Sequence, residues 1–110
     1  MGEVADLLIR CQGVRRVLCG ALVGRDIVFS ARTEDDAENA ARLLQRALDG
    51  IGFGGGHAHR AGGKIAGTHA PLKLTEDLEN ELRTRWLAAC GIDRQRGTRL
   101  VPKREIVENL

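Results

Sequence analysis

The sequence is poor in aromatic residues. Its 110 residues include two phenylalanines, one tryptophan and no tyrosine. Proteins that bind single-stranded nucleic acids by stacking present several aromatic rings to successive bases. Only Phe29, Phe53 and Trp86 could serve here. The composition therefore argues against an extended stacking platform.

Cysteines and long apolar runs are also scarce. The three cysteines, Cys11, Cys19 and Cys90, form no C-x-x-C pair, which argues against a disulfide framework or a thiolate zinc site. They are predicted to be small buried apolar residues of a cytoplasmic protein. No run of 18 apolar residues occurs and residues 1–15 do not resemble a signal peptide, so no membrane partner is expected.

The length suits one domain, and the charges are nearly balanced. A chain of 110 residues can bury an independent core, so residues 1–110 are predicted to form a single domain. The formal net charge of +2 does not by itself predict nucleic-acid binding. However, 14 of the 17 cations are arginines, which suit bidentate recognition of carboxylates or phosphates.

The first half of the chain shows helix and hairpin patterns. Apolar residues recur at helical spacing over 3–12, and Gly13 is expected to end that helix. Runs rich in β-formers at 17–23 and 27–32 flank a Gly-Arg-Asp turn, which predicts a β-hairpin. Thr33 is expected to cap an amphipathic helix that Gly50 ends.

The second half begins with a glycine-rich loop. A strand is predicted at 64–68, and Thr75 is expected to cap a further helix that ends at Gly91. A short helical segment at 103–110 is also predicted. The expected fold class is α+β, with a mixed or antiparallel sheet, packed helices and the glycine-rich loop between a helix and a strand.

The glycine cluster is the most informative feature. Residues 50–67 hold 8 of the 14 glycines. Gly54, Gly55 and Gly56 in succession allow the backbone to curl into an anion-binding nest, to which a helix beginning near His57 would add free N–H groups. His57 and Arg60 could donate to phosphate oxygens. The pattern is neither a Walker A loop nor G-x-G-x-x-G, and the alternative is a tightly turned loop without a ligand.

Ser30, Arg32 and Thr33 form a second candidate. They end a predicted strand and enter a helix, where α/β-type folds present polar groups to ligands. The alternative is that Ser30 and Thr33 are strand-end and capping residues and that Arg32 is a surface cation. Spacing alone favours this alternative.

A metal site and nucleophilic catalysis have less support. His57 and His59 would share a side only on an extended segment, and no acidic residue lies between positions 50 and 70. A small metal protein using His57, His59 and His69 stays an alternative. No G-x-S-x-G motif occurs, and Cys11 and Cys19 lie in apolar runs that disfavour the thiolate.

Residues 54–62 resemble a known signature. The run Gly-Gly-Gly-His-Ala-His-Arg-Ala-Gly is similar to the G-G-G-H-x-x-A-A-G motif of the DHH-associated domain, the C-terminal domain of DHH-family phosphoesterases. Residues 30–33 resemble that family's S-x-R-S strand end, and the resemblance covers 3–68. Arg60 stands where the family usually has alanine, and Thr33 replaces the second serine. A related domain of alanyl-tRNA synthetases generally lacks the histidine, so His57 favours the phosphoesterase branch.

The resemblance implies a part of a longer, exopolyphosphatase-related hydrolase. No D-H-H string occurs, so the chain is expected to be a C-terminal fragment whose partner is an N-terminal catalytic domain with manganese or magnesium. This chain would hold no metal, no cofactor and no catalytic residue. It would bind the phosphate of a short oligonucleotide, nucleotide or polyphosphate.

Resemblance and local chemistry together assign the phosphate contacts. Arg32 would clamp the phosphate, the N–H groups of Gly54 to Gly56 would cradle it, and His57 would donate to it. Ser30, Thr33 and Arg60 would add contacts. The alternative function is a stand-alone, noncatalytic nucleotide- or RNA-binding module. If the chain is a fragment, apolar surface left by the missing catalytic domain would promote a homodimer.

Overall fold

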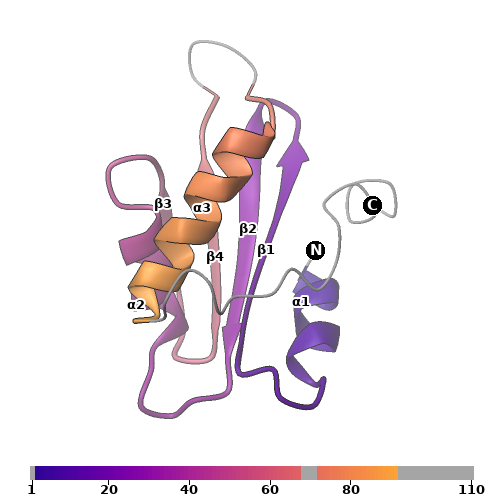
Figure 1. The fold of residues 1–110 in the computed structure, drawn as a ribbon, viewed down its shortest axis with the longest axis vertical. Coiled ribbons are helices and arrows are strands. Elements are labelled where there is room, and N and C mark those ends of the chain that lie inside the picture. The colour runs from indigo at the N-terminus through magenta and orange to yellow at the C-terminus, as the bar shows by residue number, and fades with distance from the viewer. Residues whose placement is uncertain (1, 68–71, 92–110) are drawn as a thin grey trace.

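The computed structural model describes residues 2–67 and 72–91, which form a four-stranded antiparallel sheet with three helices. The strand order is β1-β2-β4-β3, so β1 and β3 are the edges (Figure 1). The predicted α+β class with an antiparallel sheet is confirmed. In chain order the elements are α1 (Gly2–Ile9), β1 (Arg16–Val23), β2 (Asp26–Thr33), α2 (Ala40–Ala47), β3 (Phe53–Gly56), β4 (Arg60–Ile65) and α3 (Glu76–Ala89).

The two faces of the sheet carry different helices. Successive side chains of a strand point to opposite faces. On β2, Ile27, Phe29 and Ala31 join the main core under α2 and α3. Arg32 lies on the other face, where Ala5 of α1 packs on β1 in a small second core. We call these the core face and the α1 face.

Helix α2 supplies much of the main core. Its side chain Leu44 and the adjoining Leu48 are almost completely buried, as is Ile27 of β2. Trp86 of α3 lies in the same cluster. Burial of one such aliphatic side chain contributes about 1.5–3 kcal/mol, so these residues dominate the packing.

Three of the predicted features are confirmed closely. The hairpin pairs Val23 with Asp26 across a tight turn, and Gly24 there has a φ of 62°. Thr75 caps α3, accepting a hydrogen bond from the Leu78 amide at 3.2 Å. Gly91, with a φ of 71°, follows the end of that helix.

The start of the second helix was predicted wrongly. Thr33 is still in β2, paired with Arg16, and the helix begins only at Ala40. Asn39 is the N-cap, and its side chain accepts from the Arg42 amide at 3.1 Å. The acids that follow Thr33 therefore lie in a connecting turn, because strand pairing holds Thr33 in extended backbone.

The glycine-rich stretch contains a strand that the sequence did not suggest. Phe53–Gly56 forms β3 and Arg60–Ile65 forms β4, so the predicted strand at 64–68 begins four residues earlier. The first helix also ends early, at Ile9. The segment at 103–110 lies outside the described residues.

The cysteines differ in their surroundings. Cys11 is exposed, because it follows the end of α1 in a turn, and the prediction that it is buried was wrong. Cys19 is buried and Cys90 is half-buried. Burial raises the pKa of both thiols, that of Cys90 to about 11, so both are protonated at neutral pH.

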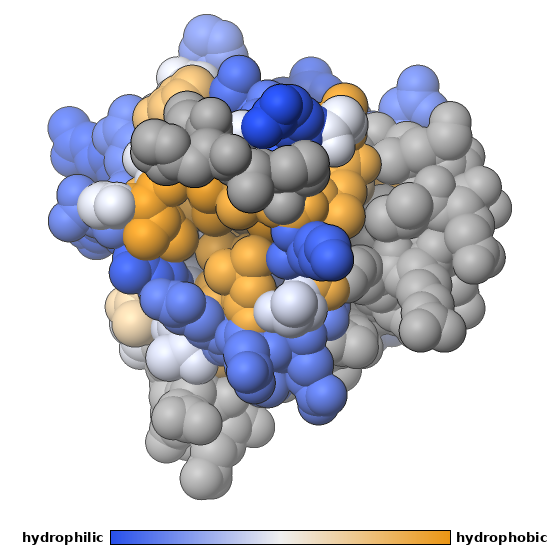
Figure 2. Space-filling model, turned by 90° about the horizontal axis from the view of Figure 1, so that it is seen from above, coloured by the Kyte–Doolittle hydropathy of each residue, from blue (hydrophilic) through white to orange (hydrophobic). Residues whose placement is uncertain are grey.

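One end of the molecule shows apolar surface. Figure 2 looks onto the end where α3 begins and shows apolar side chains at the centre with hydrophilic ones around them. The partly buried Leu22, Leu72, Leu74 and Leu78 pack against the main core near this end. No helix among residues 2–67 and 72–91 is long and apolar enough to cross a membrane.

Candidate nucleic-acid interface

The glycines of the β3–β4 hairpin permit close packing of α2. A Cβ atom added at Gly54 would lie 3.0 Å from Leu44 Cγ, and one at Gly63 would lie 2.9 Å from Leu48 Cδ1. Gly56 has a φ of 143°, and its added Cβ would lie 2.5 Å from the Arg60 oxygen. Larger residues at positions 54 and 63 would force α2 away from the sheet, and one at position 56 would clash with the backbone of β4. These three glycines therefore have a structural reason.

The turn after β3 closes onto the start of α2. The His57 amide donates to the Arg60 carbonyl at 2.7 Å. The carbonyls of His57 and Ala58 accept from the amides of Ala41 and Ala40 at 3.3 and 2.6 Å. No helix begins near His57, because the turn leads directly from β3 into β4, so no helix N-terminus adds free N–H groups there. The N–H groups at the start of α2 therefore donate to backbone carbonyls of the turn and are not free to bind an anion.

Arg32 lies beneath α1. Its side chain is 9% exposed, and its Nε donates to Asp6 Oδ1 at 2.6 Å. Its Nη1 donates to the Ala31 carbonyl at 2.8 Å. The guanidinium predicted to clamp phosphate is thus engaged within the chain.

Arg60 joins the same carboxylate from the neighbouring strand. Arg32 and Arg60 are register partners of β2 and β4, so both side chains lie on the α1 face. Arg60 Nη2 donates to Asp6 Oδ2 at 3.0 Å, and its side chain is 63% exposed. The hydrogen bond from Arg32 is the largest influence on Asp6 and lowers its pKa, although partial desolvation opposes it. Two guanidinium groups therefore hold one carboxylate.

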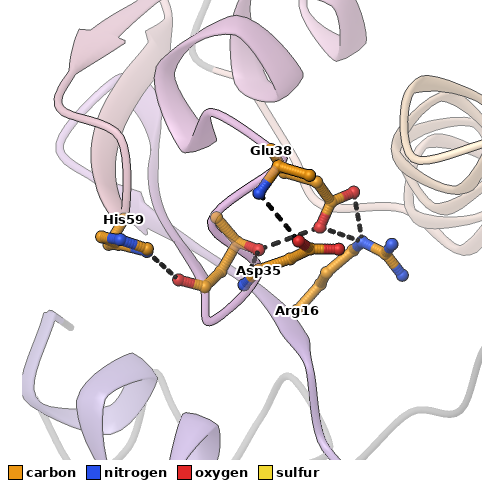
Figure 3. Close-up of polar contacts among 6 residues, drawn as sticks. Arg16, Asp35, Glu38 and His59 are labelled. Carbon is orange, nitrogen blue, oxygen red and sulfur yellow. Dashed lines mark hydrogen bonds and ion pairs between the residues drawn. The ribbon is translucent and has the colours of Figure 1, made fainter.

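Ser30 and Thr33 have different positions. Ser30 is half-buried on the α1 face near the start of α1. Thr33 is buried; its hydroxyl donates to Glu38 at 3.0 Å and accepts from the Asp35 amide at 3.2 Å. Glu38 also accepts from Arg16 Nε at 2.7 Å (Figure 3). This network ties the connecting turn to β1 and leaves Thr33 facing the protein interior.

His57 and His59, in the turn between β3 and β4, do not form a metal site with other ligands of the described residues. His59 Nδ1 donates to the Thr33 carbonyl at 2.9 Å (Figure 3), since a carbonyl can only accept. His59 Nε2 lies 3.2 Å from Asp36 Oδ1, and the His57 ring is exposed. His69 lies outside the described residues. Within the described part of the chain, no three histidines, cysteines or acids are grouped to hold a metal ion.

The part of the α1 face over β3 and β4 places the predicted Gly55 and Arg60 beside Phe53, Gly62 and Lys64, which the sequence analysis did not select as binding residues. Helix α1 packs on β1 and β2 and reaches β4 through Asp6. No other helix of the described residues packs on the rest of this face, and we call the surface formed there by Phe53, Gly55, Arg60, Gly62 and Lys64 the uncovered face. Period-two alternation through the glycines could have placed Phe53 and Gly55 together, had 53–56 been recognised as a strand.

The comparisons find a similarity of fold. No protein-family model and no curated protein sequence matches the chain. Among solved structures, it is similar to the C-Ala domain of alanyl-tRNA synthetase from Aquifex aeolicus, with a TM-score of 0.52 and 23% identity. The match covers 63% of this chain and 66% of that domain's chain.

The sequence-based identification as a DHH-associated domain of a hydrolase was wrong. The structural similarity is to the synthetase domain, and no model of a phosphoesterase family matches. The motif misled because Gly54 serves the packing of α2, Gly56 serves the close approach of β4 with a positive φ, and the histidine occupies a turn. Residues that specify packing do not discriminate between the functions that a fold can carry.

Proposed function

We propose that this domain is an RNA-binding module and that tRNA is among its ligands. The observation that carries the proposal is the similarity of its fold to a domain of alanyl-tRNA synthetase, an enzyme that acts on tRNA. Fold similarity is an analogy, so the residues must supply the chemistry. The α1 face offers exposed or partly exposed cations at Arg60 and Lys64.

Arg60 is the residue that we assign to phosphate. Its side chain is 63% exposed, and its partner in the chain is a carboxylate, which like phosphate is an anion that accepts paired hydrogen bonds from arginine. The Arg60–Asp6 pair is exposed, and such pairs contribute little to stability, so a phosphate can take the place of Asp6 on Arg60 while Asp6 stays paired with Arg32. His57, exposed in the adjoining turn, is a second donor. Arg32 stands behind Asp6 and would reach a phosphate only if Asp6 moved.

Titration of the full chain with unfractionated tRNA at two salt concentrations tests the proposal. Binding should weaken as salt rises, because phosphate contacts release counterions. Arg60→Ala should lower the affinity severalfold and reduce the salt slope by about one. Asp6→Asn should raise the affinity, because it removes the competing carboxylate.

Arg42→Ala is the matched control. Arg42 is exposed on α2, on the other side of the sheet, and its loss removes the same charge. We expect it to weaken binding less than Arg60→Ala. A folded wild-type chain that shows no salt-sensitive binding would refute the function. Equal losses in the two variants would refute only the assigned phosphate contact.

A further inference from the structure

We propose that the uncovered face binds one unpaired RNA nucleotide, whose base stacks on Phe53 and whose flanking phosphates contact Lys64 and Arg60. The inference rests on the proposed function and specifies the part of the RNA that is recognised. It also agrees with the low aromatic content, because one ring suffices for one base.

Phe53 is an aromatic residue with no role in the core. Its side chain is 62% exposed, at the start of the edge strand β3. The Lys64 ammonium lies 5.6 Å from the centre of its ring. A large apolar ring on a solvated sheet surface costs hydration free energy unless something covers it. A base that stacks on the ring can take the place of the ammonium that lies over it, and the flexible Lys64 side chain can then meet the phosphate.

Two glycines beside Phe53 have no packing reason. Among the described residues, an added Cβ at Gly55 would meet nothing within 4 Å, and one at Gly62 would make only an ordinary 3.6 Å contact. Neither has a positive φ. Gly55 and Gly62 are register partners, so they form one bare strip across β3 and β4. This contrasts with Gly54 and Gly63, which the packing of α2 requires. A bare strip lets a planar base or a sugar approach the backbone closely.

The charges of the uncovered face suit a phosphodiester strand. Lys64 and Arg60 lie four residues apart on β4, about 13 Å at strand spacing, so they can contact separate phosphates. Lys64 Nζ lies 3.6 Å from Asp26, and Arg60 contacts Asp6. Both acids are partly exposed, and such surface ion pairs contribute little to stability, so a phosphate can replace the carboxylate as the partner of either cation. The occupant is therefore a single-stranded segment and not an apolar peptide.

The test compares two probes on the full chain. One probe is a short oligoadenylate, and the other is the same sugar–phosphate oligomer without bases. Phe53→Ala should lower the affinity for oligoadenylate about tenfold and leave the affinity for the abasic oligomer unchanged. Lys64→Gln should weaken binding of both probes. Leu7→Ala removes a similarly exposed apolar side chain from α1 and should change neither affinity.

Gly62→Val gives a variant that fills the strip without removing a contact. Because valine suits strands and the position has space, the variant should unfold at or above the wild-type temperature yet lose most of its oligoadenylate binding. If valine prevents folding, Gly62→Ala provides the same comparison with a smaller side chain. Amide chemical shifts of Gly55 and Gly62 should move on titration of the wild type.

The outcomes separate the two proposals. Wild-type binding of tRNA with unchanged oligoadenylate affinity in Phe53→Ala and Gly62→Val would overturn the stacking site and leave the proposed function intact. The absence of any RNA binding by the folded wild type would overturn both. A similar loss for the two probes in Phe53→Ala would also overturn the stacking site, because the ring would then not act through a base.

Discussion

Asp6 is the residue through which α1 forms ion pairs with both central strands of the sheet. Its carboxylate accepts from Arg32 at 2.6 Å and from Arg60 at 3.0 Å, and it comes from a helix that otherwise packs through few apolar side chains. The pairing orients both guanidiniums and fixes α1 over β1 and β2. Asp6 is thus both a docking residue and a competitor for any anion that approaches Arg60.

This pairing gives the fold a dependence on acid. Because Arg32 lowers the pKa of Asp6 below its ordinary value of 3.8, the unfolded chain binds the proton more tightly than the folded chain. The stabilisation is therefore present above about pH 4 and is lost as pH falls through the lowered pKa. Urea unfolding of the wild type should show this loss between neutral pH and about pH 3.

Asp6→Asn should remove that component. The variant should be less stable than the wild type at neutral pH, and the difference should shrink in acid. Glu3→Gln, which changes an exposed carboxylate on the same helix, is the control and should keep the acid dependence. A constant difference between Asp6→Asn and the wild type at every pH would contradict the argument.

At the scale of elements, the β3–β4 hairpin and α2 form one tightly packed unit. Gly63 has Phe53 O, Leu48 Cδ1 and Leu44 Cδ2 within 3.0 Å of an added Cβ. Gly63→Ala should therefore destabilise the fold by about 1–3 kcal/mol through overpacking. Gly55→Ala should be neutral or stabilise by about 0.4–1 kcal/mol, because alanine restricts the unfolded chain. Thermal or urea unfolding measures both.

The reverse order of stability would mean that α2 does not lie as close to the hairpin as the structure places it. A large loss in Gly55→Ala alone would instead contradict the open α1 face at that position, where the described residues leave space for a Cβ atom.

The elements that the sequence predicted are those with local signals. The first hairpin carries β-formers around a glycine turn, and α3 carries its own cap in Thr75. Strand β3 has only one β-former, Phe53, and is extended because it pairs with β4 and contacts α2. The Asp6–Arg32 pair joins residues 26 positions apart, so no short-range pattern could reveal it. Predicting the uncovered face from the sequence would have required knowing both strand β3 and the position of α1 that the Asp6–Arg32 pair marks.

At the scale of the molecule, the sheet has two unequal sides. The core face carries α2 and α3 over a large cluster, whereas the α1 face has a small core around Ala5, Val17 and Cys19. Isolated helices shorter than about 12–15 residues are marginal in water, and α1 has eight residues. Docking, and not intrinsic helix stability, must therefore hold α1 in place.

Native-state amide exchange should resolve this asymmetry. Amides of α1 should exchange through a local opening of lower free energy than the amides of β2 and β4, which lie at the centre of the sheet. Asp6→Asn should lower the protection of α1 further and leave that of β4 nearly unchanged, because β4 is hydrogen-bonded between β2 and β3. Equal protection of α1 and β2, falling together in the variant, would show instead that the two sides of the sheet unfold as one unit.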